Sequence, residues 1–240
     1  GYVIINASKI VRASYGTKYV YLVGNKGEYC QFQASYNSVN EVVLLGDSLT
    51  ALGSGYANFF DVNGCGRTPF GVGGEKPTQI MGRVGIAPFR LKEDVVIPSE
   101  PTAVSIGLIS SFDNKETYPR KNYGLHECTI GGIKGSINVT TAGSAVTFTR
   151  SVSGEEVVLK EGTDVESCYY GKTNTFNVYW MGQNGYGSDD ELVDAFKLCV
   201  ANQVTNYYLV LTPHLNTSDE LEQKMQRVFG NRYINMRRWC

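Results

Sequence analysis

A serine that could act as a nucleophile follows a short apolar run. Residues 42–45 are Val-Val-Leu-Leu, the pattern of a strand buried on both faces of a parallel sheet. The run leads into Gly46, Asp47 and Ser48, and residues 49–60 can form a helix. Open α/β sheets bind ligands at such strand ends, where backbone N–H groups at a helix start stabilise negative charge. Asp47 or Ser48 could instead simply cap the helix.

Two later segments follow the same rule of a strand followed by a polar turn. Residues 71–78 read Gly-Val-Gly-Gly-Glu-Lys-Pro-Thr and precede a predicted helix over residues 77–84. Residues 181–185 read Met-Gly-Gln-Asn-Gly and follow a predicted strand over residues 175–180. Each segment also fits an ordinary turn, because glycine clusters and Asn-Gly pairs are common turn formers.

These segments, in this order, resemble the signature motifs of the SGNH (GDSL) hydrolases. Residues 44–50, Leu-Leu-Gly-Asp-Ser-Leu-Thr, resemble the first motif, which implies that Ser48 is the nucleophile. The resemblance also implies that the backbone N–H of Gly74 and the side-chain amide of Asn184 join the N–H of Ser48 in an oxyanion hole. Such donors typically contribute about 3–4 kcal/mol each to an ester's transition state. Gly185 stands where the third motif usually has an aspartate.

A catalytic base is missing from the pattern. The family takes its base from an Asp-x-x-His element near the C-terminus, and these 240 residues contain no such element. Of the chain's two histidines, His126 falls in a β-rich stretch and His214 follows an apolar run over residues 207–211. The resemblance places the loop of His214 at the pocket, so we expect His214, like Asp47, to contact substrate rather than to act as the base. We expect either a truncated chain or a degenerate binding protein.

The surrounding elements divide the chain into three parts. Residues 1–40 alternate apolar and polar residues and form a β-rich lead-in. Residues 41–85 and 168–240 have α/β texture, and the resemblance implies a flavodoxin-like, three-layer sheet of parallel strands. Further strands are predicted over residues 207–211 and 232–236, and capped helices over residues 188–199 and 217–229.

The stretch between residues 86 and 167 interrupts the α/β texture. Short β-like runs, one of them over residues 103–109, alternate with turn clusters and predict a compact, sandwich-like β insertion. Such an insertion resembles those of SGNH proteins of phage tails and bacterial cell surfaces. The resemblance implies a location outside the cytoplasm, at a cell surface or on a phage virion, and leaves an oligomer through the insertion possible.

Composition excludes several classes of partner. Lys plus Arg is 22 and Asp plus Glu is 23, so the net charge of −1 offers no field to attract nucleic acid. No stretch approaches eighteen apolar residues, so no membrane span is predicted. The six cysteines form no CxxC pair and the histidines number two, so we expect no metal site and no cofactor.

Three functions remain open on this pattern. The first is a serine esterase that removes O-acyl groups, such as acetyl, from a carbohydrate. The alternative is a catalytically incomplete module that binds a carbohydrate or a receptor on the same scaffold. A nucleotide-binding domain that uses residues 71–74 as a phosphate loop ranks last, because neither a Walker lysine nor a spaced GxGxxG follows a strand.

Overall fold

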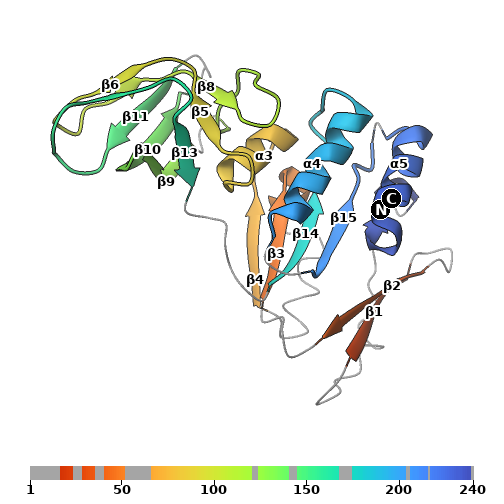
Figure 1. The fold of residues 1–240 in the computed structure, drawn as a ribbon. Helices are drawn as coiled ribbons and strands as arrows, with labels where there is room; N and C mark the ends of the chain where they lie inside the picture. The colour runs from red at the N-terminus through yellow and green to blue at the C-terminus, as the bar shows by residue number, and fades with distance from the viewer. Residues whose placement is uncertain are drawn as a thin grey trace. The chain divides into compact units, whose positions relative to one another are not determined.

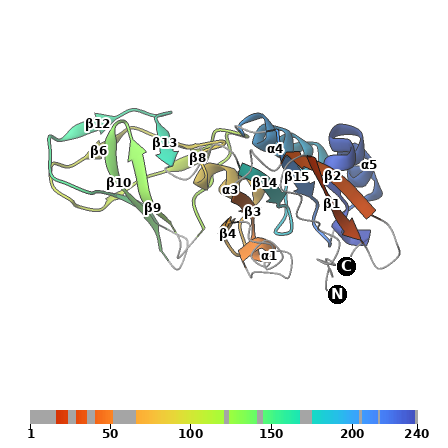
Figure 2. The same ribbon diagram turned by 90° about the horizontal axis from the view of Figure 1, so that it is seen from below.

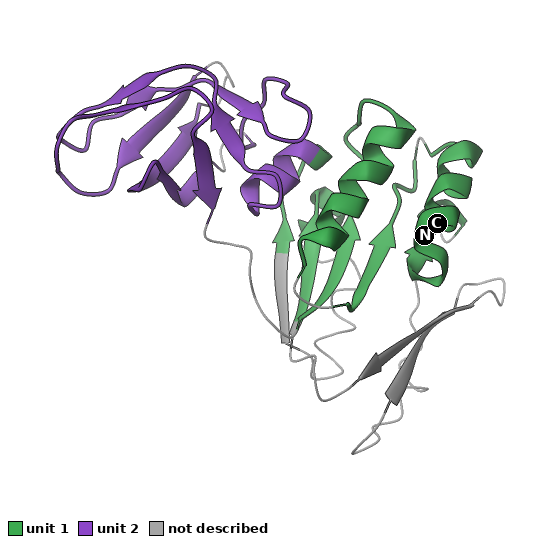
Figure 3. Cartoon of the chain, in the orientation of Figure 1, with its two compact units in different colours: residues 1–77, 171–240 green, residues 78–170 purple. Residues whose placement is uncertain are grey.

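The computed structural model (Figure 1) describes residues 17–23, 29–35, 41–51, 66–120, 124–140, 145–167, 175–203, 206–215 and 217–238. The chain forms two compact units (Figure 3): unit 1 comprises residues 1–77 and 171–240, and unit 2 comprises residues 78–170. The insertion predicted from the sequence, residues 86–167, lies within unit 2, which begins earlier, at residue 78, and ends at residue 170. Unit 2 begins earlier mainly because it contains almost all of the helix over residues 77–83.

Unit 1 is built on a five-stranded parallel sheet. Its strand order is β16-β15-β14-β3-β4, and every neighbouring pair runs parallel. The central strand β14 is buried at all six positions, including the polar residues Thr175 and Asn177. The predicted α/β texture with a parallel sheet is therefore confirmed. The strands are β3 (Glu41–Gly46), β4 (Gly66–Gly71), β14 (Thr175–Trp180), β15 (Tyr208–Leu211) and β16 (Tyr233–Ile234).

Helices lie on both faces of this sheet (Figure 2). On one face, α4 (Asp189–Ala201) and α5 (Asp219–Phe229) meet through an edge-to-face pair of Phe196 and Phe229, whose ring centroids are 6.2 Å apart. The side chain of Ser188 caps α4, as predicted, and that of Ser218 caps α5, one residue after the predicted start at Thr217. On the other face, Leu49 of α1 (Ser48–Ala51) packs against a buried apolar cluster that contains side chains of β3, β14, β15 and β16. The rest of the predicted helix over 49–60 lies outside the described residues.

Smaller elements complete unit 1. In the predicted lead-in, β1 (Thr17–Val23) and β2 (Tyr29–Ser35) form an antiparallel pair, and the remainder of residues 1–40 lies outside the described part. Two short 3-10 helices, η2 (Gly230–Arg232) and η3 (Met236–Arg238), flank β16.

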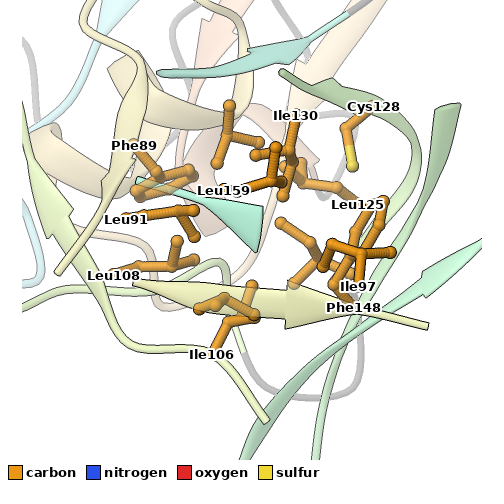
Figure 4. Close-up of a cluster of buried hydrophobic side chains, with 13 residues drawn as sticks. Phe89, Leu91, Ile97, Ile106, Leu108, Leu125, Cys128, Ile130, Phe148 and Leu159 are labelled. Carbon is orange, nitrogen blue, oxygen red and sulfur yellow. The ribbon is translucent and has the colours of Figure 1, made fainter. Parts of the chain in front are cut away.

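Unit 2 is a curled antiparallel sheet with a two-stranded ribbon. The large sheet has the order β7-β11-β10-β9-β13-β5-β8, and β12 pairs with β6. Its core contains fully buried Phe89, Ile130 and Phe148 (Figure 4). The helix α3 (Pro77–Arg83) begins at the boundary of the units. The strands are β5 (Phe89–Leu91), β6 (Val95–Ile97), β7 (Val104–Ser105), β8 (Leu108–Ser110), β9 (Leu125–Ile130), β10 (Ile133–Val139), β11 (Val146–Arg150), β12 (Val157–Leu159) and β13 (Asp164–Ser167).

The two edge strands of the large sheet are consecutive in the sequence. Only Ile106 and Gly107 separate β7 from β8, although β7 pairs with β11 and β8 pairs with β5. The apolar run that predicted one strand over residues 103–109 is therefore two strands at opposite ends of the sheet. Because these ends are close together, the sheet curls around its core.

Candidate active site

The strands of unit 1 end in one row across the sheet. Gly46, the last residue of β3, is in register with Gly71 of β4 and with Trp180 of β14. Trp180 is in register with Leu211 of β15, which in turn pairs with Ile234 of β16. The loops that follow this row begin at the same edge, where parallel sheets place ligand sites. All three segments singled out in the sequence belong to these loops.

Ser48 begins α1 and is partly buried. The turn that holds it is tight, because a Cβ atom on Gly46 would lie well under 3.0 Å from the side-chain oxygen of Thr50 and from the carbonyl oxygen of Trp180. The backbone N–H of Thr50 donates to the carbonyl oxygen of Asp47 at 3.1 Å. Only glycine at the end of β3 lets the chain turn this closely past β14 and present Ser48.

The segment of Gly74 turns beside Ser48. The backbone N–H of Glu75 donates to the carbonyl oxygen of Val72 at 3.3 Å, and Gly74 has a φ of 79°, in the left-handed region that favours glycine. A Cβ atom built on Gly73 would lie 3.8 Å from the Cβ atom of Ser48. The turn over residues 72–75 therefore passes within van der Waals reach of the serine.

Asn184 lies in the turn that follows β14. The backbone N–H of Gly185 donates to the carbonyl oxygen of Gly182 at 3.1 Å, and both glycines have positive φ. The side-chain Nδ2 atom of Asn184 donates to the carbonyl oxygen of Glu75 at 3.0 Å, which joins this turn to the one that contains Gly74. An amide nitrogen carries two hydrogens, so the second remains for another acceptor. The structure thus brings the segments of Ser48, Gly74 and Asn184 together.

Asp47 has an internal role. Its exposed fraction is 0%, which leaves no surface for the substrate contact that the sequence suggested. Its Oδ1 atom accepts a hydrogen bond from the N–H of Leu49 at 3.0 Å. Burial raises the pKa of the Asp47 carboxyl, while hydrogen bonds from the backbone N–H groups of Leu49 and Gln183 and the charge of His214 oppose that rise.

His214 lies in the loop after β15, close enough to Asp47 for a charge interaction. Its Nδ1 atom is buried and has no hydrogen-bond partner among the described residues. Within that same part of the chain, no hydrogen bond joins Ser48 to a histidine. His126 is exposed on β9 of unit 2. The side chain of His214 thus lies near Asp47, the residue before the proposed nucleophile. The sequence did not predict this proximity.

Two residues of this edge were missed by reasoning from the sequence. Glu75 supplies the carbonyl oxygen that holds Asn184, and the backbone N–H of Gln183 lies close enough to Asp47 to lower the pKa of its carboxyl. Both contacts use backbone atoms, which every residue possesses, so residue type gives no signal for them. Their positions next to Gly74 and Asn184 are the one sequence feature that could have drawn attention to them.

In the described ranges, no three or more His, Cys, Asp or Glu side chains gather in a way that could hold a metal ion. No helix within those ranges has both the length and the apolar character needed to cross a membrane. Comparison of the chain with protein-family models, with curated proteins and with solved structures found no match.

Proposed function

We propose that unit 1 is a serine esterase domain of the SGNH (GDSL) type, which hydrolyses O-acyl esters, acetyl esters above all, on a carbohydrate. The observation that carries the proposal is the common edge of β4, β3 and β14, from which the segments of Gly74, Ser48 and Asn184 emerge side by side. The strand order supports a flavodoxin-like sheet, since it is the 2-1-3-4-5 order when the strands are renumbered along the chain.

The proposed chemistry uses Ser48 as the nucleophile. Its Oγ atom attacks the acyl carbon, and its proton passes to a base. The N–H groups of Ser48 and Gly74 and the Nδ2 atom of Asn184 then stabilise the oxyanion. Collapse of the intermediate breaks the bond to the sugar oxygen, which takes up the proton, and water hydrolyses the acyl-enzyme. Since this chain has no Asp-x-x-His element, we do not assign the base to a residue in it.

The carbohydrate substrate rests on the resemblance to SGNH proteins of phage tails and cell surfaces. Unit 2 supports it as a separate β unit that interrupts the α/β chain between the second and third motifs. The second candidate, a carbohydrate- or receptor-binding module without activity, is favoured by one observation. Among the described residues, Ser48 has no hydrogen bond to a histidine that could remove its proton.

The test separates the nucleophile from its base. Wild type, Ser48→Ala and the control Ser151→Ala, which changes an exposed serine of unit 2, are incubated with a fluorophosphonate probe and with p-nitrophenyl acetate. Imidazole is added in a parallel series as an external base. We expect labelling and turnover, with or without imidazole, that Ser48→Ala abolishes and Ser151→Ala retains. Equal rates in wild type and Ser48→Ala under both conditions would contradict the esterase and favour the binding module.

A further inference from the structure

Unit 2 carries an exposed pair of valines on its two-stranded ribbon of β6 and β12. In the register of these strands Val96 is opposite Val158, and the two residues are 50% and 53% exposed. Their neighbours Val95, Ile97 and Leu159 are buried in the core of the unit. Because side chains alternate between the faces of a strand, one side of the ribbon covers the core and the other presents the valine pair. We call this outward side the valine face.

Exposed apolar side chains gather at this ribbon. Five large ones are exposed in the part of the chain that the structure describes, and three of them belong to the ribbon or to the turn before β12. The third is Val152, which is 69% exposed in that turn. Arg150 ties the turn to the end of the ribbon, since it donates to the carbonyl oxygens of Pro98 and Glu155. Single exposed apolar residues are common, but a group of them in one place is typical of a binding surface.

The charges around the valine face are mostly negative. Asp94 and Lys160 lie on this face by alternation, and they neutralise each other in an ion pair of 2.7 Å. Glu156, two residues before Val158, shares the same face, is exposed, and forms no ion pair within the described ranges.

The segments that form the ribbon and its ends contain more carboxylates than cations. Residues 92–100 and 150–161 have six Asp and Glu against three Lys and Arg. All three cations are already engaged: the two lysines form ion pairs of 2.8 Å and 2.7 Å, and the guanidinium of Arg150 is buried among backbone carbonyl oxygens. The exposed carboxylates of these two segments therefore form an acidic rim beside the valine face.

We propose that the valine face and its acidic rim dock a short basic segment of a partner protein, with aliphatic side chains at its centre and lysines or arginines on either side. The aliphatic side chains cover Val96 and Val158, and the cations meet Glu156 and the other carboxylates of the rim. A second copy of this chain fits less well, because a two-fold interface brings one acidic rim against the other. The surface belongs to unit 2 alone and does not depend on the proposed esterase.

Fluorescence anisotropy of a labelled peptide with the full chain tests the surface. The probe is the fluorescein-labelled peptide Lys-Lys-Val-Val-Val-Lys-Lys. One comparison peptide has glutamate in place of every lysine, and the other has serine in place of every valine. We expect the probe to bind and both comparison peptides to bind at least about tenfold more weakly, because the first loses the charge complementarity and the second the apolar contact.

Variants of the chain separate the apolar contact from the charge. Val96→Thr combined with Val158→Thr should weaken binding of the probe about tenfold, because two methyl groups become hydroxyls while threonine remains a good strand former. The matched control is Val228→Thr, which changes a 42% exposed valine of α5 and should leave binding unchanged. Glu156→Gln should weaken binding about threefold at low salt and hardly at all at high salt, whereas Glu127→Gln, at an exposed position of β9, should have no effect.

The outcomes that overturn the proposal are distinct. All the substituted side chains are exposed, so urea midpoints should match that of wild type. Absence of probe binding to wild type, equal binding of the glutamate peptide, or binding that the double valine variant retains in full would each overturn it. Self-association of wild type in analytical ultracentrifugation that the double valine variant abolishes would overturn it as well, in favour of a second copy as the occupant. None of these measurements uses turnover, so failure of the proposed esterase leaves the result intact.

Discussion

Replacement of Gly46 by alanine should disturb the two strands that carry the proposed catalytic groups. The added Cβ atom would lie well under 3.0 Å from the carbonyl oxygen of Trp180, the register partner of Gly46 on β14. The side chain of Thr50, which is equally close, can rotate, but a backbone oxygen in a sheet cannot. Relief of this clash therefore requires the end of β14 or the start of α1 to move.

The expected size of the effect follows from this geometry. Overpacking a filled site costs about 1–3 kcal/mol, and a backbone acceptor leaves little room to relax, so we expect a destabilisation of about 3 kcal/mol. At 1.36 kcal/mol per factor of ten, the folding equilibrium of unit 1 changes by more than about a hundredfold. A displacement of about 1 Å at Ser48 would lower any turnover by a similar factor.

Tryptophan fluorescence during urea unfolding measures the change in unit 1. The chain has two tryptophans, Trp180 and Trp239, and neither lies in the sequence of unit 2. The matched control is Gly73→Ala, whose Cβ atom would make an ordinary contact of 3.8 Å with Ser48. We expect this control to unfold within about 1 kcal/mol of wild type. Equal urea midpoints for Gly46→Ala and Gly73→Ala would refute the register of β3 against β14 described above.

Three further changes test other parts of the structure. Asn184→Ala should lower kcat for Ser48-dependent turnover by about 10²–10³-fold, the effect of removing one oxyanion donor, as steady-state kinetics would reveal. Phe148→Ala should destabilise unit 2 by about 3–5 kcal/mol, because the ring is fully buried; calorimetry would detect this loss. Arg150→Met removes a buried guanidinium that donates to three backbone carbonyls, so hydrogen exchange at the Gly154 N–H, which bonds to Ser99, should accelerate.

The sheet of unit 1 was largely predictable because its strands are buried on both faces. Such strands lack alternation and read as continuous apolar runs, as residues 42–45 and 207–211 do. Polar side chains close to helix starts likewise predicted the cap at Ser188 and placed the start of the second capped helix at Thr217, one residue before its cap Ser218. The run over residues 103–109 misled because its apolar pattern carries no information about which neighbour each half pairs with.

The proximity of Asp47 and His214 could not be predicted from spacing. The two residues follow β3 and β15, which are not neighbours in the sheet, since β14 lies between them. Their interaction depends on strand order and on how far each loop folds back over the edge. Residue types predicted which side chains are chemically able to react, whereas the pairing of distant loops depends on tertiary structure.

The hydrogen bond between Ser167 and the backbone carbonyl of Arg83 has a consequence for how the chain folds. It fastens the two ends of unit 2 together across 84 residues. Once unit 2 has folded, the loop that closes when Glu41 pairs with Thr175 is shorter by that length, which reduces its closure entropy by about 1 kcal/mol. During synthesis β3 emerges long before β14, so early folding of the insertion shortens the time that the strand leading to Ser48 spends as an exposed edge.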